Sequence, residues 1–326
     1  MTCRICGNTQ GNTSWQAREM MLGMRTPFPY FECAACGCLQ IENVPEDLAP
    51  YYPTNYYSFE AASPVAGLGA RLKRWRDSAE LSGRPWIGRW LARWRPNHEL
   101  AALRSLRLTP DSRILDVGAG SGRILGVLAG LGFRSLEGID PYLPQERLAG
   151  EGYVVKRCSI FELAGEYDLL MFSHAFEHME EPGRVLEQAR SLLAPAGACF
   201  LRIPTSSSYA WRHYRTDWVQ LDAPRHFYLH STASIERVAR DAGLRIERLF
   251  WDSSAFQLWG SEQYRRDIPL LSERSWVRNP GASEFQPRDL RRFAVQARAL
   301  DRRREGDEIV VILRPVRSPA KDHPAM

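Results

Sequence analysis

The fold of this chain is decided at residues 113–123, which have the sequence Arg113-Ile-Leu-Asp-Val-Gly-Ala-Gly-Ser-Gly-Arg123. Residues 114–117 predict a short buried strand, and glycines follow at positions 118, 120 and 122. A helical apolar pattern then begins at Ile124. A strand, a Gly-rich turn and a helix in this order are typical of the ligand-binding edge of a doubly wound α/β sheet.

Asp116 indicates which ligand this turn accepts. A carboxylate beside a helix N-terminus would repel a pyrophosphate, and the glycine spacing is G-x-G-x-G instead of the dinucleotide pattern G-x-G-x-x-G. The turn therefore suits a cofactor with a cationic amino group and no phosphate. The pattern D-x-G-x-G-x-G resembles motif I of the class I S-adenosylmethionine-dependent methyltransferases. The alternative is an ordinary Gly-rich turn between a strand and a helix.

The rest of the chain agrees with this resemblance, which implies a Rossmann-like sheet of seven strands. Beyond the first strand, runs of apolar residues predict strands at residues 135–140, 153–157, 167–172, 198–203, 244–251 and 307–314. Residues 252–306 are predicted to be a helical insertion before the last strand, with an Arg-rich helix at 287–304.

Several residues at the ends of these strands are candidates for cofactor contact. Asp140 ends the second strand, where a carboxylate can bind both ribose hydroxyls. Ser159 stands where many relatives have an acidic residue that binds the adenine amino group. The resemblance implies S-adenosylmethionine contacts at Asp116, Gly118, Ala119, Gly120, Gly122, Asp140, Pro141, Ser159, Ile160, Ser173 and His174.

Two later loops are expected to hold the acceptor. The stretch H-x-x-E-H-x-x-x-P from His174 to Pro182 resembles the branch of class I methyltransferases that acts on small molecules. Residues 206–228 contain a D-x-P-R-H segment, in which Arg225 is a candidate ligand for an acceptor phosphate or carboxylate. His226 and His178 are the candidate catalytic bases, since imidazole titrates near neutral pH.

The N-terminus predicts a separate metal-binding module. Two Cys-x-x-Cys-Gly segments supply four thiolates, which is the closed tetrahedral set of structural zinc. The predicted zinc ligands are Cys3, Cys6, Cys33 and Cys36. A disulfide is the weaker interpretation in a cytoplasmic protein, and a redox site would need only one pair.

These features predict four segments: a zinc ribbon and Tyr-rich linker at 1–58, a basic Trp-rich helical connector at 59–100, the methyltransferase domain at 101–316 and a disordered tail at 317–326. Residues 84–95 form a Trp/Arg amphipathic pattern that suits packing on another domain or contact with a membrane surface.

Composition and charge limit the class of function. The chain has 44% hydrophobic residues, 25% charged residues and a net charge of +5, without an apolar run that could span a membrane. Cytoplasm is the expected location, with the inner membrane face as an alternative. A ribbon joined to such a domain resembles bacterial methyltransferases that act on sugars or polysaccharide precursors. The predicted function is methyl transfer to an oxygen or carbon of a sugar, nucleotide-sugar or lipid-linked glycan.

Two other functions stay open. RNA methylation would use the ribbon and the basic helices to bind phosphates. It is disfavoured because the loop after the fourth strand, Ser173-His-Ala-Phe, lacks the Asn/Asp-Pro-Pro-aromatic pattern of enzymes that methylate planar bases. A non-catalytic S-adenosylmethionine-binding protein is disfavoured because Asp116, the glycines and Asp140 are all present.

Overall fold

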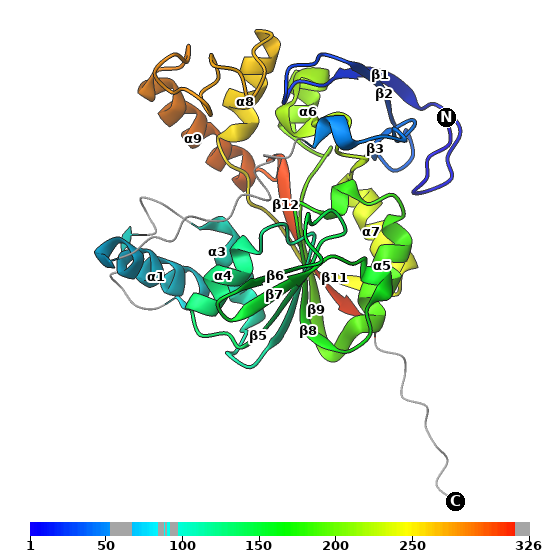
Figure 1. Ribbon diagram of the computed structural model, residues 1–326. Coiled ribbons are helices and arrows are strands. Elements are labelled where there is room, and N and C mark those ends of the chain that lie inside the picture. The colour runs from blue at the N-terminus through cyan, green and yellow to red at the C-terminus, as the bar shows by residue number, and fades with distance from the viewer. Residues whose placement is uncertain (53–66, 84–87, 89, 92–96, 317–326) are drawn as a thin grey trace, which may run out of the picture.

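The central sheet has eight strands in the order β11-β12-β9-β8-β4-β5-β7-β6 in the computed structural model (Figure 1). The structure describes residues 1–52, 67–83, 88, 90–91 and 97–316. Most of the 84–95 helix, the Tyr-rich linker beyond residue 52 and the 317–326 tail lie outside the described residues. Domain boundaries at 58 and 100 stay predictions.

Five strands at the centre of the sheet are parallel, and each runs toward the same edge. They are β4 (Arg113–Val117), β5 (Ser135–Ile139), β7 (Tyr153–Lys156), β8 (Tyr167–Ser173) and β9 (Leu193–Pro204). On one side, β12 (Glu308–Pro315) and β11 (Leu244–Trp251) add antiparallel pairs. All seven predicted strands are present.

The expected count of seven is wrong, because β6 (Arg147–Gly150) forms an eighth strand antiparallel to β7. Its four residues alternate between exposed and half-buried positions, and no large apolar side chain other than Leu148 belongs to it. A short edge strand of this kind lacks the apolar period from which strands are predicted.

Helices cover both faces of the sheet, as a doubly wound fold requires. One buried cluster joins the sheet to α3 (His98–Leu103) and α4 (Arg123–Gly130), next to α1 (Gly67–Ser82). The opposite cluster joins it to α5 (Pro182–Leu192) and α7 (Thr232–Asp241). The two groups of helices lie on opposite sides of the strands in Figure 1.

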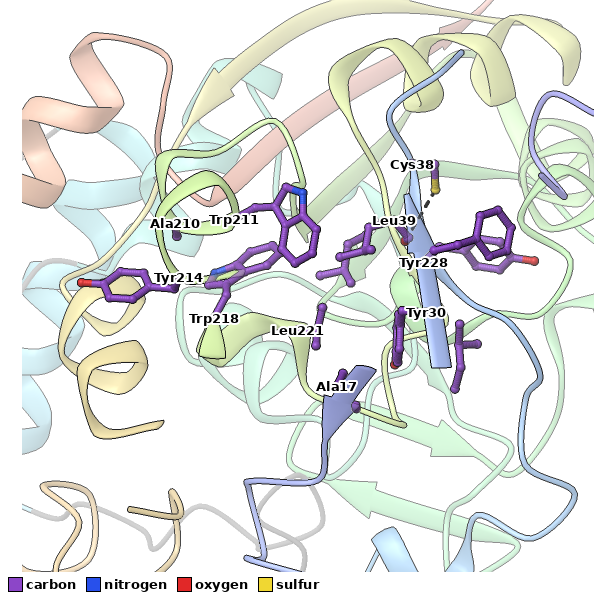
Figure 2. Close-up of a cluster of buried hydrophobic side chains, with 14 of the residues drawn as sticks. Ala17, Tyr30, Cys38, Leu39, Ala210, Trp211, Tyr214, Trp218, Leu221 and Tyr228 are labelled. Carbon is purple, nitrogen blue, oxygen red and sulfur yellow. Dashed lines mark hydrogen bonds between the residues drawn. The ribbon is translucent and has the colours of Figure 1, made fainter. Parts of the chain in front are cut away.

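A second sheet combines the N-terminus with a distant segment. Its order is β1 (Thr13–Arg18), β2 (Pro27–Glu32), β3 (Leu39–Ile41) and β10 (Tyr228–Leu229). Side chains from both parts share one buried cluster, in which Tyr30 and Leu39 pack with Trp211 and Trp218 (Figure 2). The N-terminal module is therefore completed by the loop that follows β9.

The segment between β11 and β12 also packs on this cluster. It contains α8 (Phe256–Arg265) and α9 (Pro287–Arg302), which contribute Leu258 and Phe293. Figure 1 shows both helices beside α6 (Tyr209–Tyr214). The helix predicted at 287–304 is thus present. Among the helices that the structure describes, none has the length and apolar character needed to cross a membrane.

Arg225 is an internal ion-pair residue, and the prediction that it binds an acceptor anion is wrong. Its side chain is completely buried. The guanidinium donates to Asp222 at 2.6 and 2.9 Å, to Glu19 Oε1 at 3.0 Å and to the Tyr51 carbonyl at 3.2 Å. Because Glu19 follows β1 and Asp222 precedes β10, this one cation joins the N-terminal module to the loop after β9.

We expect Arg225→Ala to destabilise the fold by about 3–5 kcal/mol, because it leaves Glu19 as a buried carboxylate without its cation. Urea unfolding followed by tryptophan fluorescence measures the change. Arg212→Ala is the matched control, since it removes an exposed pair with Glu305 and should change stability by about 1 kcal/mol or less. Equal effects of the two substitutions would contradict the assigned role of Arg225.

Candidate functional site

The Gly-rich turn between β4 and α4 has the backbone conformation that its glycines predict. Gly118, Gly120 and Gly122 have φ values of 77°, 52° and 74°, which side chains rarely adopt. The amides of Gly118 and Ala119 both donate to the Ile139 carbonyl, at 2.8 and 3.0 Å. A Cβ on Gly118 would lie 2.5 Å from the Ala175 Cβ, so the turn is pressed against the loop after β8.

Asp116 is a buried carboxylate that lacks an internal partner. It is 3% exposed, and no hydrogen bond to it forms among the described residues. Burial raises the pKa of its carboxyl group well above the usual value; nearby Glu99 adds to this and Arg123 opposes it. A cationic ligand group would relieve this unfavourable burial. The observation fits the predicted role of Asp116 in binding the amino group of S-adenosylmethionine.

Asp140 lies at the end of β5 and connects to the same turn. Its Oδ2 accepts from the Gly120 amide at 3.0 Å, and its Oδ1 accepts from the Tyr142 amide at 2.9 Å. Burial raises the pKa of Asp140, and these two hydrogen bonds oppose the rise. Each oxygen retains a lone pair, which suits the vicinal hydroxyls of a ribose. Pro141, the next residue, is exposed beside it.

Ser159 has a structural partner already. Its hydroxyl accepts from the Phe161 amide at 3.4 Å and its amide donates to Glu162, which forms a capping box for a short 3₁₀ helix. The hydroxyl proton stays available to a ligand. Ile160, one residue later, is 4% exposed and packs into the core. Contact of these two residues with adenine stays a prediction.

His174 lies in a charge network at the end of β8 and β9. Half-buried Ser173 precedes it, and His174 itself has φ 52°. Its Nε2 lies 3.6 Å from Glu308 and its Nδ1 lies 3.5 Å from Glu177. Burial lowers its pKa, but these two carboxylates outweigh that effect and raise it to about 10. Contact of Ser173 and His174 with the cofactor stays a prediction.

Sequence reasoning missed the remaining members of this network. Arg202 on β9 pairs with Glu308 and, at 3.1 Å, with Asp252, which also accepts from His98 at 2.8 Å. Arg202 and Glu308 were visible only as charged residues within or beside apolar strands. Because β9 and β12 are paired, the two charges meet at the sheet edge.

The two candidate bases are brought together by their loops. The rings of His178 and His226 are 4.7 Å apart and nearly perpendicular, with an interplanar angle of 73°. Their Nδ1 atoms lie 2.8 Å from the carbonyls of Arg225 and Gln220, respectively. Burial, helped by the neighbouring His178, lowers the pKa of His226 to about 4. A lone pair on Nε2 is therefore present in His226 at neutral pH.

Glu177 lies within the H-x-x-E-H stretch, whose pattern did not predict a role for it. It is completely buried, and neither carboxylate oxygen accepts a hydrogen bond from a described residue. Burial raises its pKa, but His174, His178 and His226 outweigh that effect and lower it to about 2. The loops after β8 and before β10 thus enclose an ionised carboxylate beside two imidazoles.

The four predicted zinc ligands converge. Their sulfur atoms all lie within 4.8 Å of one another, with Cys3 and Cys36 at 3.6 Å and Cys6 and Cys33 at 3.5 Å. Four sulfurs about 2.3 Å from one zinc ion lie a little under 4 Å apart. Cys38 is not part of this group: it is fully buried in the adjoining core.

Comparison with known proteins finds a matching family model and a curated relative. Residues 89–249 match a family model described as a methyltransferase domain. A ubiquinone biosynthesis O-methyltransferase of Thiobacillus denitrificans is 28% identical over 202 residues, which are 53% of this chain and 85% of that protein.

Solved structures give weaker likenesses. A Burkholderia thailandensis 1,6-didemethyltoxoflavin-N1-methyltransferase with bound S-adenosylhomocysteine is 17% identical, with a TM-score of 0.39 over 79% of this chain and 94% of that one. An S-adenosylmethionine-dependent methyltransferase of Mesorhizobium loti is also 17% identical, with a TM-score of 0.41 over 67% and 98%. Likenesses of this size do not bear on the acceptor.

The matched domain spans the Gly-rich turn, Asp116, Asp140 and the loop after β8. The turn packs against Ala175 where a Cβ on Gly118 would not fit, and the buried Asp116 carboxylate beside it suits a cationic amino group. The chain is thus an S-adenosylmethionine-dependent methyltransferase with the α/β fold of class I.

Proposed function

We propose that this enzyme methylates an oxygen or carbon of a small-molecule acceptor, in the class of sugars and polysaccharide or lipid-linked precursors. The observation that carries the proposal is the pair of imidazoles His178 and His226, whose ring centroids are 4.7 Å apart. His178 belongs to the loop in which Ala175 lies against Gly118. The related protein of Thiobacillus denitrificans is named as a ubiquinone biosynthesis O-methyltransferase, which supports an oxygen as the atom that is methylated.

Separate residues of this chain would bind the cofactor and accept the proton of the acceptor. Asp116 binds the amino group of the cofactor, Asp140 binds its ribose hydroxyls, and the backbone of the glycine turn lies against it. The cofactor supplies an electrophilic methyl group on a sulfonium. Holding the acceptor in line with that methyl group is most of the catalysis. His226 or His178 accepts the proton of the acceptor at Nε2.

The N-terminal module is proposed to hold a structural zinc ion through Cys3, Cys6, Cys33 and Cys36. Gln40 donates to Cys3 Sγ at 3.2 Å, a contact of the kind that supports metal-bound thiolates. Four protein ligands leave no open position, so this zinc would stabilise the β1-β2-β3 sheet and take no part in catalysis.

The other predicted functions have no observation in their favour. No contact among the described residues supports RNA binding by the ribbon or by the basic helices. Membrane contact through residues 84–95 concerns a segment that lies mostly outside the described residues. Both stay predictions, and so does the expected cytoplasmic location.

Asp116→Asn and Asp140→Asn should each weaken S-adenosylmethionine binding by about 10- to 100-fold, because a charge-assisted hydrogen bond contributes about 1.5–3 kcal/mol. Isothermal titration calorimetry measures the affinity. The control is Asp111→Asn, which alters an exposed carboxylate paired with Arg134. Unchanged affinity in both site variants would reject the cofactor assignment.

His226→Ala should keep cofactor affinity within about twofold and lower turnover by about 10²- to 10⁴-fold, the range of general-base catalysis. Methyl transfer is measured by mass spectrometry against a panel of nucleotide-sugars, glycolipid precursors and RNA. His213→Ala serves as the control, since its exposed ring lies on α6 and outside the acceptor loops. If His226→Ala retains full turnover, the role passes to His178 or to neither residue. Methylation of RNA alone would overturn the proposed acceptor class.

The purified chain should contain about one zinc ion, measured by inductively coupled plasma mass spectrometry. Cys33→Ser should lose the zinc and lower the melting temperature, because structural zinc sites contribute directly to folding. Cys158→Ser is the control, because this thiol packs against the core of the central sheet and is not part of the cysteine cluster. Full zinc content after Cys33→Ser would contradict the predicted ligand set.

A further inference from the structure

The strongest unexplained feature of the molecule is the buried Glu177 carboxylate. It has 0% exposure, and both of its oxygens lack a hydrogen bond from the described residues. An ionised carboxylate in this environment is strongly unfavourable unless a cation lies close to it. The nearest side-chain nitrogen is His174 Nδ1, which lies 3.5 Å from Glu177 Oε1 and thus outside normal hydrogen-bond distance.

Two imidazoles face the same carboxylate in a defined orientation. The Nδ1 atoms of His178 and His226 each lie 2.8 Å from a backbone carbonyl, which can only accept a hydrogen bond. Each neutral ring therefore carries its proton on Nδ1 and its lone pair on Nε2. Histidines that bind metals are held in this way, with the second ring nitrogen donating to a carbonyl or carboxylate.

The spacing of the three groups fits an ion between them. Glu177, His178 and His226 each place one potential ligand atom within 4.8 Å of the others. His226 Nε2 is 3.9 Å from Glu177 Oε1, too far for a direct hydrogen bond. Ligand atoms about 2.1 Å from one ion lie about 3 to 4 Å apart, so an ion can span this gap with small movements.

We propose that Glu177, His178 and His226 bind one divalent transition-metal cation at the acceptor side of the active site. Two imidazoles and one carboxylate suit manganese, iron, cobalt or zinc, and they leave coordination positions open. This cluster is distinct from the four-cysteine group, whose thiolates form a closed set in the N-terminal module.

The proposed cation lies between the cofactor turn and the acceptor loop, so its open coordination positions can bind an acceptor hydroxyl. Glu177 and His178 follow Ala175, which is pressed against Gly118 of the cofactor turn. His226 belongs to the acceptor loop, and the Phe227 amide donates to the Glu177 carbonyl at 2.8 Å. With both Nε2 lone pairs used as metal ligands, neither imidazole acts as the base. The cation then orients the acceptor hydroxyl toward the cofactor and lowers the pKa of that hydroxyl, and its proton leaves to water. This role rests on the proposed function, whereas the binding site itself does not.

Manganese binding tests the inference directly. The full-length protein is treated with a mild chelator that leaves the four-cysteine site loaded, and free Mn²⁺ is followed by electron paramagnetic resonance during titration. We expect the unaltered protein to bind about one Mn²⁺ per chain. The variants Glu177→Gln, His226→Asn and His178→Ala should each bind Mn²⁺ at least tenfold more weakly. His178 is half-buried, so its substitution disturbs the core least. His213→Ala should bind Mn²⁺ like the unaltered protein. Thermal melts and S-adenosylmethionine calorimetry identify any variant that has lost its fold.

The outcomes separate the metal site from the proposed function. If Mn²⁺ does not bind, or binds equally well to Glu177→Gln and the unaltered protein, the metal site is rejected and Glu177 is a counter-ion of His174. Methylation of a small-molecule hydroxyl at full rate by metal-free enzyme would also reject it. If Mn²⁺ binds as expected but no small molecule is methylated, the metal site stands and the proposed acceptor class fails.

Discussion

The buried guanidinium of Arg225 is the interaction on which the arrangement of the acceptor side depends. Its side chain neutralises Glu19 beside the N-terminal sheet and Asp222 in the loop before β10. Its backbone carbonyl accepts a hydrogen bond from His178 Nδ1 at 2.8 Å. One residue thus fixes the module, the loop and a candidate active-site imidazole relative to one another. Since breaking a buried ion pair leaves an uncompensated charge, this arrangement has little freedom to shift.

A second set of contacts builds the cofactor side in an independent way. Backbone hydrogen bonds hold this side together. The Gly118 and Ala119 amides donate to the Ile139 carbonyl at the end of β5, and the Gly120 amide donates to Asp140. These bonds hold the turn without using the Asp116 carboxylate, which remains buried and available. The two halves of the site therefore meet along the line where Gly118 contacts Ala175.

The N-terminal sheet has a broader role than a separate metal-binding module would have. Its fourth strand, β10, comes from the loop that carries His226, and its core is shared with α8 and α9. A change in the cysteine cluster is therefore connected through β3 and β10 to the acceptor loop. The N-terminal module also holds the backbone of the loop that carries His226, since the Tyr30 hydroxyl donates to the His226 carbonyl at 2.8 Å.

The sequence by itself determined the features that are encoded within about ten residues. The seven apolar strands, the glycine turn with Asp116, and the two Cys-x-x-Cys pairs follow from local periodicity, turn chemistry and ligand type. The edge strand β6 was missed because its residues carry no such period.

Only the tertiary structure decided which charges meet. Glu177 and His226 are about fifty residues apart, and Arg225 and Glu19 about two hundred, so no local pattern connects them. Arg225 was expected to face a ligand because its segment looked like a polar loop, yet packing of the N-terminal module buried it. Burial and pairing depend on which distant segments come into contact, and they set whether a charged residue binds a ligand or stabilises the fold.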